Sequence, residues 1–331
     1  MPEGHSVHRI ARQFARNFVG KQVHASSPQG RFAAGAASIS GQTMVESWAV
    51  GKQMFLKFES GEWIRVHLGI YGAWDFAGSV EMDATIASAN GRMGQTNMRG
   101  TVYDADGENS LSSIGAPRKS RVRMGEQTVA GRVGEAVSRP FEEFPPEPIG
   151  QVRLRLLTDT VCADLRGPTA CELLTEEQVE ATIAKLGPDP QHDSGKKAEA
   201  KFVDRLRKKT TPVGIQLMDQ SVVAGIGNVY RAEMLFRAGL DPYKPGNQIT
   251  LDEAQALWKD WVKLLAIGVE TGQMMTMDGL RGKKWEAAMA NRADRHWVYK
   301  REGLPCRKCG TNIRLDMMAS RKLYWCPSCQ T

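Results

Sequence analysis

Apolar residues near the N-terminus recur at the spacing of one helical face. They are Val7, Ile10, Ala11, Phe14 and Phe18, and they follow an i, i+3, i+4, i+7 pattern. Gly20 follows this run and is typical of a helix end. The pattern predicts a short amphipathic helix with one buried face.

The rest of the first half shows the alternating or continuous apolar pattern of β-strands. Five segments carry it: Met44–Val50, Gln53–Phe58, Trp63–Leu68, Ser120–Met124 and Val152–Leu157. Residues 59–62 predict a turn between the second and third segments. Ala84–Lys119 and Pro140–Gly150 lack periodicity and predict loops. We therefore expect an N-terminal β-rich domain, either a sandwich or a flattened barrel.

Helical periodicity takes over in the second half of the chain. A Pro- and Gly-containing segment from Leu186 to Gly195 predicts a linker. Beyond it, Ala198–Lys209 predicts a basic amphipathic helix, and Val229–Ala238 predicts a helix closed by Gly239. Thr250 and Glu253 form the pattern of a capping box that begins a helix over Leu251–Thr271. The fold class is therefore α+β.

Composition and charge indicate which class of partner the protein binds. The chain has 331 residues, 41% hydrophobic and 24% charged, and its formal net charge is +7. Residues 1–195 carry a net charge of −3 and residues 196–331 carry +10. A basic half points to a polyanion, first of all a nucleic acid, although a solvated basic surface is the alternative. The absence of a long apolar run or a secretory signal predicts a cytoplasmic protein with no membrane partner.

Four of the six cysteines form two closely spaced pairs at the C-terminus. The pattern is Cys306-x2-Cys309-x16-Cys326-x2-Cys329. Two such turns on a β-hairpin can place four thiolates around one Zn²⁺ ion. A closed four-thiolate site leaves no position for substrate, so we expect one structural zinc; two disulfides or unligated thiols are the alternatives.

The first residues, Met1-Pro2-Glu3-Gly4, carry candidate chemistry. Removal of Met1 would leave Pro2 with a free α-amine, and about a tenth of such an amine is neutral at pH 7. A neutral amine is a nucleophile, and Glu3 beside it is a candidate general acid or base. An ordinary exposed terminus is the alternative.

Further motifs follow in order along the chain. They are Gly51-Lys52, the run from Val66 to Gly72, the run from Asp219 to Glu233 that contains Gly225-Ile226-Gly227-Asn228, and the four cysteines. Together with Met-Pro-Glu-Gly, this set resembles the formamidopyrimidine-DNA glycosylase and endonuclease VIII family of base-excision repair enzymes. The resemblance covers most of the chain and fades between about Gly78 and Pro148.

The resemblance implies roles for individual residues. Pro2 would attack the sugar of the damaged nucleotide and form an imine, while Glu3 would move protons. Lys52 would assist catalysis and hold phosphate, unless it is a plain surface lysine. Asn228, in a helix-two-turn-helix motif, and Arg321, in the zinc hairpin, would grip phosphates.

Three residues of the first half are candidates for contacts with the DNA bases. Ile70 and Tyr71 would fill the space vacated by a flipped nucleotide, with packing into the core as the alternative. Arg166 would contact the opposite strand, and a structural salt bridge is equally expected.

The chain also departs from the family pattern. His5 and Ser6 stand where family members often carry an acidic side chain, and Gly214 stands in place of a phosphate-binding lysine. The pocket contacts and the phosphate contacts at these positions are therefore in doubt.

The resemblance implies four segments and one activity. Residues 1–186 would form the catalytic β-sandwich domain, 187–196 a linker, 197–295 the helix-two-turn-helix domain, and 296–331 the zinc-finger hairpin. The chain would be a monomeric, bifunctional DNA glycosylase and AP lyase acting on double-stranded DNA with damaged bases or abasic sites. It would need no redox or nucleotide cofactor. Met-Pro-Glu-Gly and the Ile-Tyr-Gly loop favour oxidised pyrimidines. The alternatives are an 8-oxoguanine-preferring member and a catalytically silent zinc-containing DNA-binding protein.

Overall fold

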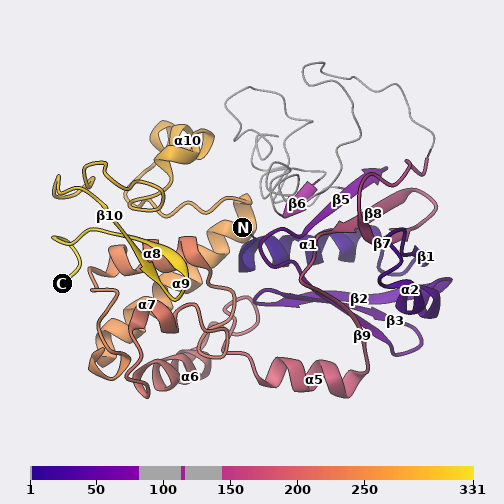
Figure 1. Cartoon of the computed structure of the whole chain (residues 1–331), viewed down its shortest axis with the longest axis horizontal. Helices are drawn as coiled ribbons and strands as arrows, with labels where there is room; N and C mark the ends of the chain where they lie inside the picture. The colour runs from indigo at the N-terminus through magenta and orange to yellow at the C-terminus, as the bar shows by residue number, and fades with distance from the viewer. Residues whose placement is uncertain (1, 82–112, 116–143) are drawn as a thin grey trace. The chain divides into compact units, whose positions relative to one another are not determined.

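The computed structural model describes residues 2–81, 113–115 and 144–331, and these form two compact units. The first unit comprises Met1–Pro2 and Ser6–Thr182. The second comprises Glu3–His5 and Ile183–Thr331, so three N-terminal residues belong with the C-terminal half. Figure 1 labels most of the helices and strands of both units.

The first unit is built on a sheet of strands from both ends of its sequence. The strands are β1 (Gln22–Ser26), β2 (Gln42–Val50), β3 (Gln53–Phe58), β4 (Trp63–His67), β5 (Ala73–Gly78), β6 (Ser113–Gly115), β7 (Val152–Leu157), β8 (Val161–Arg166) and β9 (Ala170–Leu174). Their order across the described sheet is β6-β5-β8-β7-β1-β2-β3-β4-β9, and every pairing is antiparallel. Strand β1 pairs with β2 on one side and β7 on the other, so it joins the two halves of the sheet.

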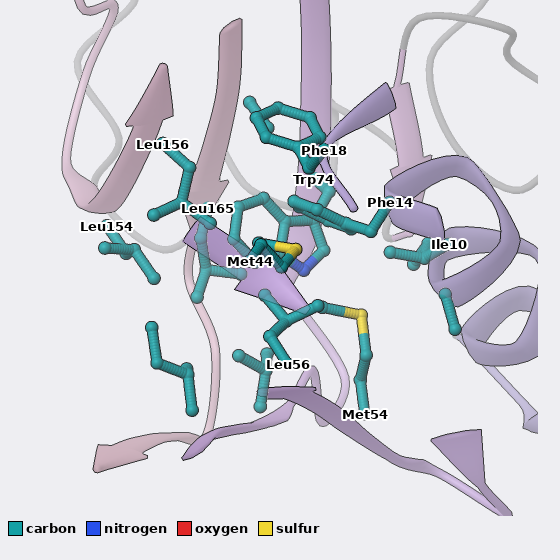
Figure 2. Close-up of a cluster of buried hydrophobic side chains, with 14 of the residues drawn as sticks. Ile10, Phe14, Phe18, Met44, Met54, Leu56, Trp74, Leu154, Leu156 and Leu165 are labelled. Carbon is teal, nitrogen blue, oxygen red and sulfur yellow. The ribbon is translucent and has the colours of Figure 1, made fainter. Parts of the chain in front are cut away.

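The core of the first unit lies between the two halves of this sheet. Figure 2 shows Met54 and Leu56 of β3 on one side and Leu156 and Leu165 of β7 and β8 on the other. Helix α1 (Gly4–Asn17) adds its apolar face to the same cluster. The ring of Phe14 packs edge-on against Trp74, with 4.7 Å between the ring centroids. Helices α2 (Ala33–Ile39) and α5 (Glu176–Ala184) complete the described elements of this part.

The second unit is helical and ends in a two-stranded hairpin. Its elements are α6 (Lys196–Arg207), α7 (Val213–Gln216), α8 (Asn228–Ala238), η2 (Gly246–Gln248), α9 (Leu251–Thr271), α10 (Lys283–Ala290), η3 (Arg292–Asp294), β10 (Arg314–Met318) and β11 (Arg321–Trp325). The core of this unit includes Trp258 and Trp261 of α9, which are almost fully buried. Within the described residues, no helix has both the length and the apolar character that a membrane crossing requires.

Helix α8 is joined to the segment before the hairpin through one buried carboxylate. Glu233 accepts hydrogen bonds from the backbone N–H groups of Trp297 (2.8 Å), Val298 (2.9 Å) and Tyr299 (2.8 Å). The Thr276 hydroxyl donates a fourth hydrogen bond, at 2.5 Å. Burial raises the pKa of Glu233, and these hydrogen bonds oppose the shift.

Most of the elements expected from the sequence are confirmed. The ranges of β3, β7 and α9 agree with the predicted ones, and all five residues of the predicted apolar face are buried, four on α1 and Phe18 directly after its end. The capping box of Thr250 and Glu253 is present, and Gly239 closes α8 in the left-handed conformation. The expected α+β class, with a β-domain, a helical domain and a terminal hairpin, is confirmed.

Two predictions in the middle of the first half have a different outcome. The loop expected over Ala84–Lys119 is wrong at Ser113–Gly115, because these residues pair with β5 as strand β6. Three residues are too few to show a periodic pattern in the sequence. Pairing with β5 is what makes Ser113–Gly115 a strand. The strand expected over Ser120–Met124 lies outside the described residues.

Candidate active site

The carboxylate of Glu3 caps the N-terminus of helix α8. Its oxygens accept hydrogen bonds from the backbone N–H groups of Gly227 (2.9 Å), Val229 (2.8 Å) and Tyr230 (3.4 Å). The N-cap residue of α8, Gly227, has no side chain to do this. The helix dipole also favours a negative charge at this end. Glu3 is fully buried, so the helix and the carboxylate satisfy each other.

The backbone beside Glu3 lies in close contact with the turn before α8. The N–H of Gly4 donates to the carbonyl of Gly225 at 2.9 Å. A Cβ atom on Gly4 would lie 2.8 Å from the Cα of Gly225, closer than real Cβ contacts. Gly225 itself has φ of +95°, which favours glycine. The glycines of this turn therefore fit against residues 3 and 4 of the same chain.

The side chain of Asn228 is bonded to the hairpin backbone. Its Nδ2 donates to the carbonyl of Lys322 at 2.8 Å, and its Oδ1 accepts from Arg231 at 2.5 Å. Arg231 also donates to Lys322 at 3.1 Å and to the carbonyl of Gly214 at 3.5 Å. These contacts connect α8, α7 and β11.

Arg231 is a site residue that sequence reasoning missed. It is fully buried, and burial lowers its pKa to about 10, while Glu3 opposes the shift and Arg321 adds to it. The guanidinium is therefore a charged group at neutral pH. The available signal was an arginine three residues after Asn228, in a helix whose residues are mostly apolar.

Arg321 begins strand β11 directly after a tight turn. The turn residues Ala319 and Ser320 have φ values of +47° and +61°, and Met318 pairs with Arg321 across it. Left-handed conformations at two consecutive non-glycine residues are uncommon and are typical of hairpin turns and functional loops. The turn places Arg321, which is half-buried, at the tip of the hairpin.

The position of Gly214 is explained by packing against the hairpin. A Cβ atom there would lie 2.7 Å from the sulfur of Met318 and 2.9 Å from the carbonyl oxygen of Pro242. A lysine at this position would displace one of them. The departure from the family pattern is therefore matched to the way α7 and β10 pack in this chain.

The four cysteines come together as expected for a zinc site. Their sulfur atoms all lie within 4.8 Å of one another. Cys306 and Cys329 are 3.9 Å apart, and Cys309 and Cys326 are 3.5 Å apart. Tetrahedral thiolates at Zn–S bonds of about 2.3 Å would be separated by about 3.8 Å. The residues present thus fit Zn²⁺.

Backbone turns hold the cysteine pairs. Gly310 follows the first pair with φ of +79°, and its N–H donates to the carbonyl of Cys306 at 2.9 Å. Gln330, almost fully buried, accepts from the N–H of Cys326 at 2.9 Å. The two turns therefore have their shape fixed by hydrogen bonds outside the sulfur atoms.

In the first unit, Lys52 lies in the two-residue turn between β2 and β3. Val50 and Gln53 pair on either side of this turn, and Gly51 has φ of +59°. The charge of Lys52 acts on His67, which pairs with Gln53 across β3 and β4. Burial lowers the pKa of His67 below 6.5, and Lys52 and Arg65 add to the shift. Pro2, in the same unit, is buried.

Ile70 and Tyr71 are exposed on the turn between β4 and β5. Their exposed fractions are 40% and 36%, so they do not pack into the core. Gly69, with φ of +66°, and Gly72 flank them, and the N–H of Gly72 donates to the carbonyl of Leu68 at 2.9 Å. The turn presents two apolar side chains to solvent.

Arg166 forms the structural salt bridge that was its alternative reading. Its guanidinium pairs with Asp75, and Nη1 donates to the carbonyl of Ile149 at 2.8 Å. The side chain is 13% exposed. The ion pair joins the side chain of Arg166 on β8 to Asp75 on β5.

Three parts of the chain match known domain families, and two of these are formamidopyrimidine-DNA glycosylase domains. Residues 1–104 match the formamidopyrimidine-DNA glycosylase N-terminal domain, 186–278 match the formamidopyrimidine-DNA glycosylase H2TH domain, and 303–331 match the zinc finger found in FPG and IleRS. Endonuclease 8 1 of Mycobacterium tuberculosis is 34% identical over 331 residues, which is 100% of both chains. The chain belongs to the formamidopyrimidine-DNA glycosylase and endonuclease VIII family of DNA glycosylases.

Another relative matches over a smaller part of the chain, and two solved structures share its fold at low sequence identity. The formamidopyrimidine-DNA glycosylase of Parasynechococcus marenigrum is 36% identical over 149 residues, 45% of this chain and 51% of that one. The Lactococcus lactis enzyme bound to an AP-site-containing DNA has a TM-score of 0.65 and 19% identity, covering 99% of both chains. MutM of Thermus thermophilus has a TM-score of 0.64 and 23% identity, covering 99% of this chain and 98% of that chain. The fold is shared with both structures.

Proposed function

We propose that the chain is a bifunctional DNA glycosylase and AP lyase that removes oxidised pyrimidines from double-stranded DNA and acts as a monomer. The observation that carries the proposal is the fixed position of Glu3, next in sequence to Pro2, at the N-terminus of α8. A free α-amine at Pro2 would be partly neutral at pH 7 and therefore nucleophilic. A carboxylate held beside it can move protons without first having to find its orientation.

The reaction begins with attack of the Pro2 nitrogen on C1′ of the damaged nucleotide. The bond between C1′ and the base breaks, the base leaves with a proton, and the sugar ring opens to give an iminium between C1′ and Pro2. Glu3 moves the protons required at the base and at the ring oxygen. Loss of a proton from C2′ then breaks the bond between C3′ and its oxygen, which cuts the strand, and water releases Pro2. Elimination at C5′ would cut the other side.

The remaining candidates hold and open the DNA. Lys52 assists catalysis and binds phosphate in the catalytic domain of residues 1–186. Asn228, from the helix-two-turn-helix domain of residues 197–295, and Arg321, from the zinc-finger hairpin of residues 296–331, bind phosphates beside the lesion. The exposure of Ile70 and Tyr71 supports a wedge that fills the stack after the nucleotide is flipped out. The Asp75 pair of Arg166 favours its structural role.

The zinc ion in this proposal is structural. Cys306, Cys309, Cys326 and Cys329 would supply all four ligands, so the ion would be closed to substrate. It would hold the ends of the hairpin together and thereby fix the turn that carries Arg321. The imine chemistry itself uses no redox or nucleotide cofactor.

The preference for oxidised pyrimidines rests on the relatives. Endonuclease 8 1 matches along the full length, whereas the formamidopyrimidine-DNA glycosylase of Parasynechococcus marenigrum matches over less than half of the chain. This supports the endonuclease VIII branch. An enzyme that prefers 8-oxoguanine is the alternative.

Borohydride trapping on matched duplexes tests the proposal. The duplexes carry an abasic site, 5-hydroxyuracil or 8-oxoguanine, and the protein is confirmed to start at Pro2 and to hold zinc. We expect a covalent adduct with the abasic duplex, preferential removal of 5-hydroxyuracil, and impaired base removal in Pro2→Gly, which keeps a free α-amine but loses the proline ring. Preference for 8-oxoguanine would reassign the substrate. No adduct from the wild-type protein would leave a silent DNA-binding protein.

A further inference from the structure

Gly227 is a glycine that its own backbone does not require. Its φ and ψ are −120° and −160°, an extended conformation open to any residue. Gly225, two residues earlier, differs because its φ is +95°. As the N-cap of α8, position 227 would ordinarily favour Ser, Thr, Asp or Asn, whose side chains accept from the first helical N–H groups.

Glu3 explains the glycine. A Cβ atom at position 227 would lie 2.3 Å from the Cδ of Glu3, and 2.6 Å from both its Cγ and its Oε1. Real Cβ atoms essentially never come within 3.0 Å of a non-bonded heavy atom. The N–H of Gly227 meanwhile donates to Oε2 of Glu3 at 2.9 Å. One residue thus supplies both the room for the carboxylate and one of its donors.

We propose that Gly227 is a positioning residue for Glu3 in the base-removal step. The inference rests on the proposed function and adds to it a residue that touches neither DNA nor Pro2 in that scheme. A methyl group at this position would push the carboxylate away and weaken its hydrogen bonds to Val229 and Tyr230. A displacement of about 1 Å in a catalytic group can reduce a rate by about 100-fold.

The substitution Gly227→Ala separates base removal from imine formation. We expect single-turnover removal of 5-hydroxyuracil to fall by about 100-fold. Borohydride trapping on a duplex with a preformed abasic site should stay within about threefold of wild type, because no base has to leave there and the abasic sugar opens to its aldehyde without Glu3. The matched control is Gly195→Ala, at the N-cap of α6, where a Cβ would meet only Asp193 Oδ1 at 3.2 Å. This control should keep both activities.

A double variant tests whether the effect passes through Glu3. Glu3→Ala removes the atoms that the new Cβ would strike, so Glu3→Ala/Gly227→Ala should remove the base at the same rate as Glu3→Ala alone. The melting temperature of the double variant should exceed that of Gly227→Ala. If Gly227→Ala does not fold but the double variant does, the steric argument is supported.

Two outcomes would overturn the positioning role. One is wild-type base removal by folded Gly227→Ala, and the other is a further loss when Gly227→Ala is added to Glu3→Ala. The failure of the proposed function has a different signature, because the wild-type protein would then form no adduct with the abasic duplex.

Discussion

At the scale of single residues, one buried guanidinium connects three elements of the second unit, α7, α8 and β11. Arg231 donates to the carbonyls of Gly214 and Lys322 and to the side chain of Asn228. The three acceptor oxygens belong to α7, to β11 and to the first residue of α8. An arginine suits this position because its planar group carries five donors in fixed directions.

Replacing Arg231 by Met, an unbranched apolar side chain of similar volume, should destabilise the protein. We expect the free energy of unfolding to fall by about 2–4 kcal/mol, since hydrogen bonds from a charged donor are lost and their acceptors stay buried. Chemical denaturation of the zinc-loaded protein measures this. Lys259→Met, an exposed position on α9, is the control and should change the value by less than about 0.5 kcal/mol. Equal stability of the Arg231 variant and wild type would contradict the role.

His67 should make stability depend on pH below neutrality. Its pKa is lowered in the folded chain by burial and by Lys52 and Arg65, from an ordinary value of 6.5. Between the two pKa values the unfolded chain binds more protons, so stability falls as pH falls below 6.5, by at most about 1.4 kcal/mol per pH unit. Denaturation curves of wild type and His67→Gln at pH 7.5 and 5.5 measure the difference. The idea fails if both proteins lose the same amount.

Sequence reasoning could reach residues whose chemistry is carried by type and spacing. The four cysteines and the Pro2-Glu3 pair are of this kind, because two-residue spacings and an N-terminal amine are visible in the chain. Arg231 and Gly227 are different. Their partners lie 91 and 224 residues away, at Lys322 and Glu3, and only the folded structure brings them together.

The hairpin carries both the four-cysteine cluster and Arg321, the residue proposed to bind phosphate. The cysteine turns lie at one end, and the Ala319–Ser320 turn with Arg321 lies at the other. Between them, Leu323 and Trp325 of β11 are buried against Met318. Loss of the metal should therefore change the part of the hairpin that carries Arg321.

Removal of zinc should unfold the hairpin. Structural zinc sites contribute about 10–16 kcal/mol to folding in model peptides, more than a two-stranded hairpin can replace. We expect a lower melting temperature and a change in the fluorescence of Trp325 after verified metal removal, with recovery when Zn²⁺ is added back. An unchanged melting curve would show that the hairpin does not depend on the metal.

At the element scale, local signals predicted some elements and long-range pairing determined others. Helix α9 could be predicted residue for residue because a capping box begins it and an apolar face runs through it. Strand β1 was not predicted, because its five residues alternate in burial but Val23 is the one large apolar residue among them, which is too weak a signal. Its partners are β2, the next strand along the chain, and β7, which is distant in sequence, and pairing with both decides its conformation.

At the scale of the whole molecule, the positive net charge lies in the second half of the chain, which favours binding of a polyanion such as DNA there. Residues 196–331 carry a net charge of +10, and exposed lysines on α6 contribute to it at positions 196, 197 and 201. Attraction of this kind concentrates a polyanion near the surface and weakens with salt. Composition alone predicted this property, whereas the division of residues 3–5 from their neighbours required the structure.

Binding to a duplex that contains an abasic analogue should weaken with salt. The slope of log K against log [salt] should be about −0.9 for each phosphate contacted, so Arg321→Ala should make it shallower by about 1. Titrations between about 50 and 200 mM salt measure it. Lys57→Ala is the control, because Lys57 pairs with Glu176 at 2.7 Å. An Arg321 variant with unchanged slope and affinity would remove this residue from the interface.

The amide protons of Trp297, Val298 and Tyr299 should exchange with water only when the Glu233 carboxylate releases them. Since one acceptor group holds all three, one opening event releases them together, and under conditions where every opening leads to exchange they should exchange at one rate. Hydrogen–deuterium exchange with Glu233→Gln as the comparison would measure that rate, which should rise in the variant. These three protons would then report how often α8 and the segment leading to the hairpin separate, on a time scale that no static distance gives.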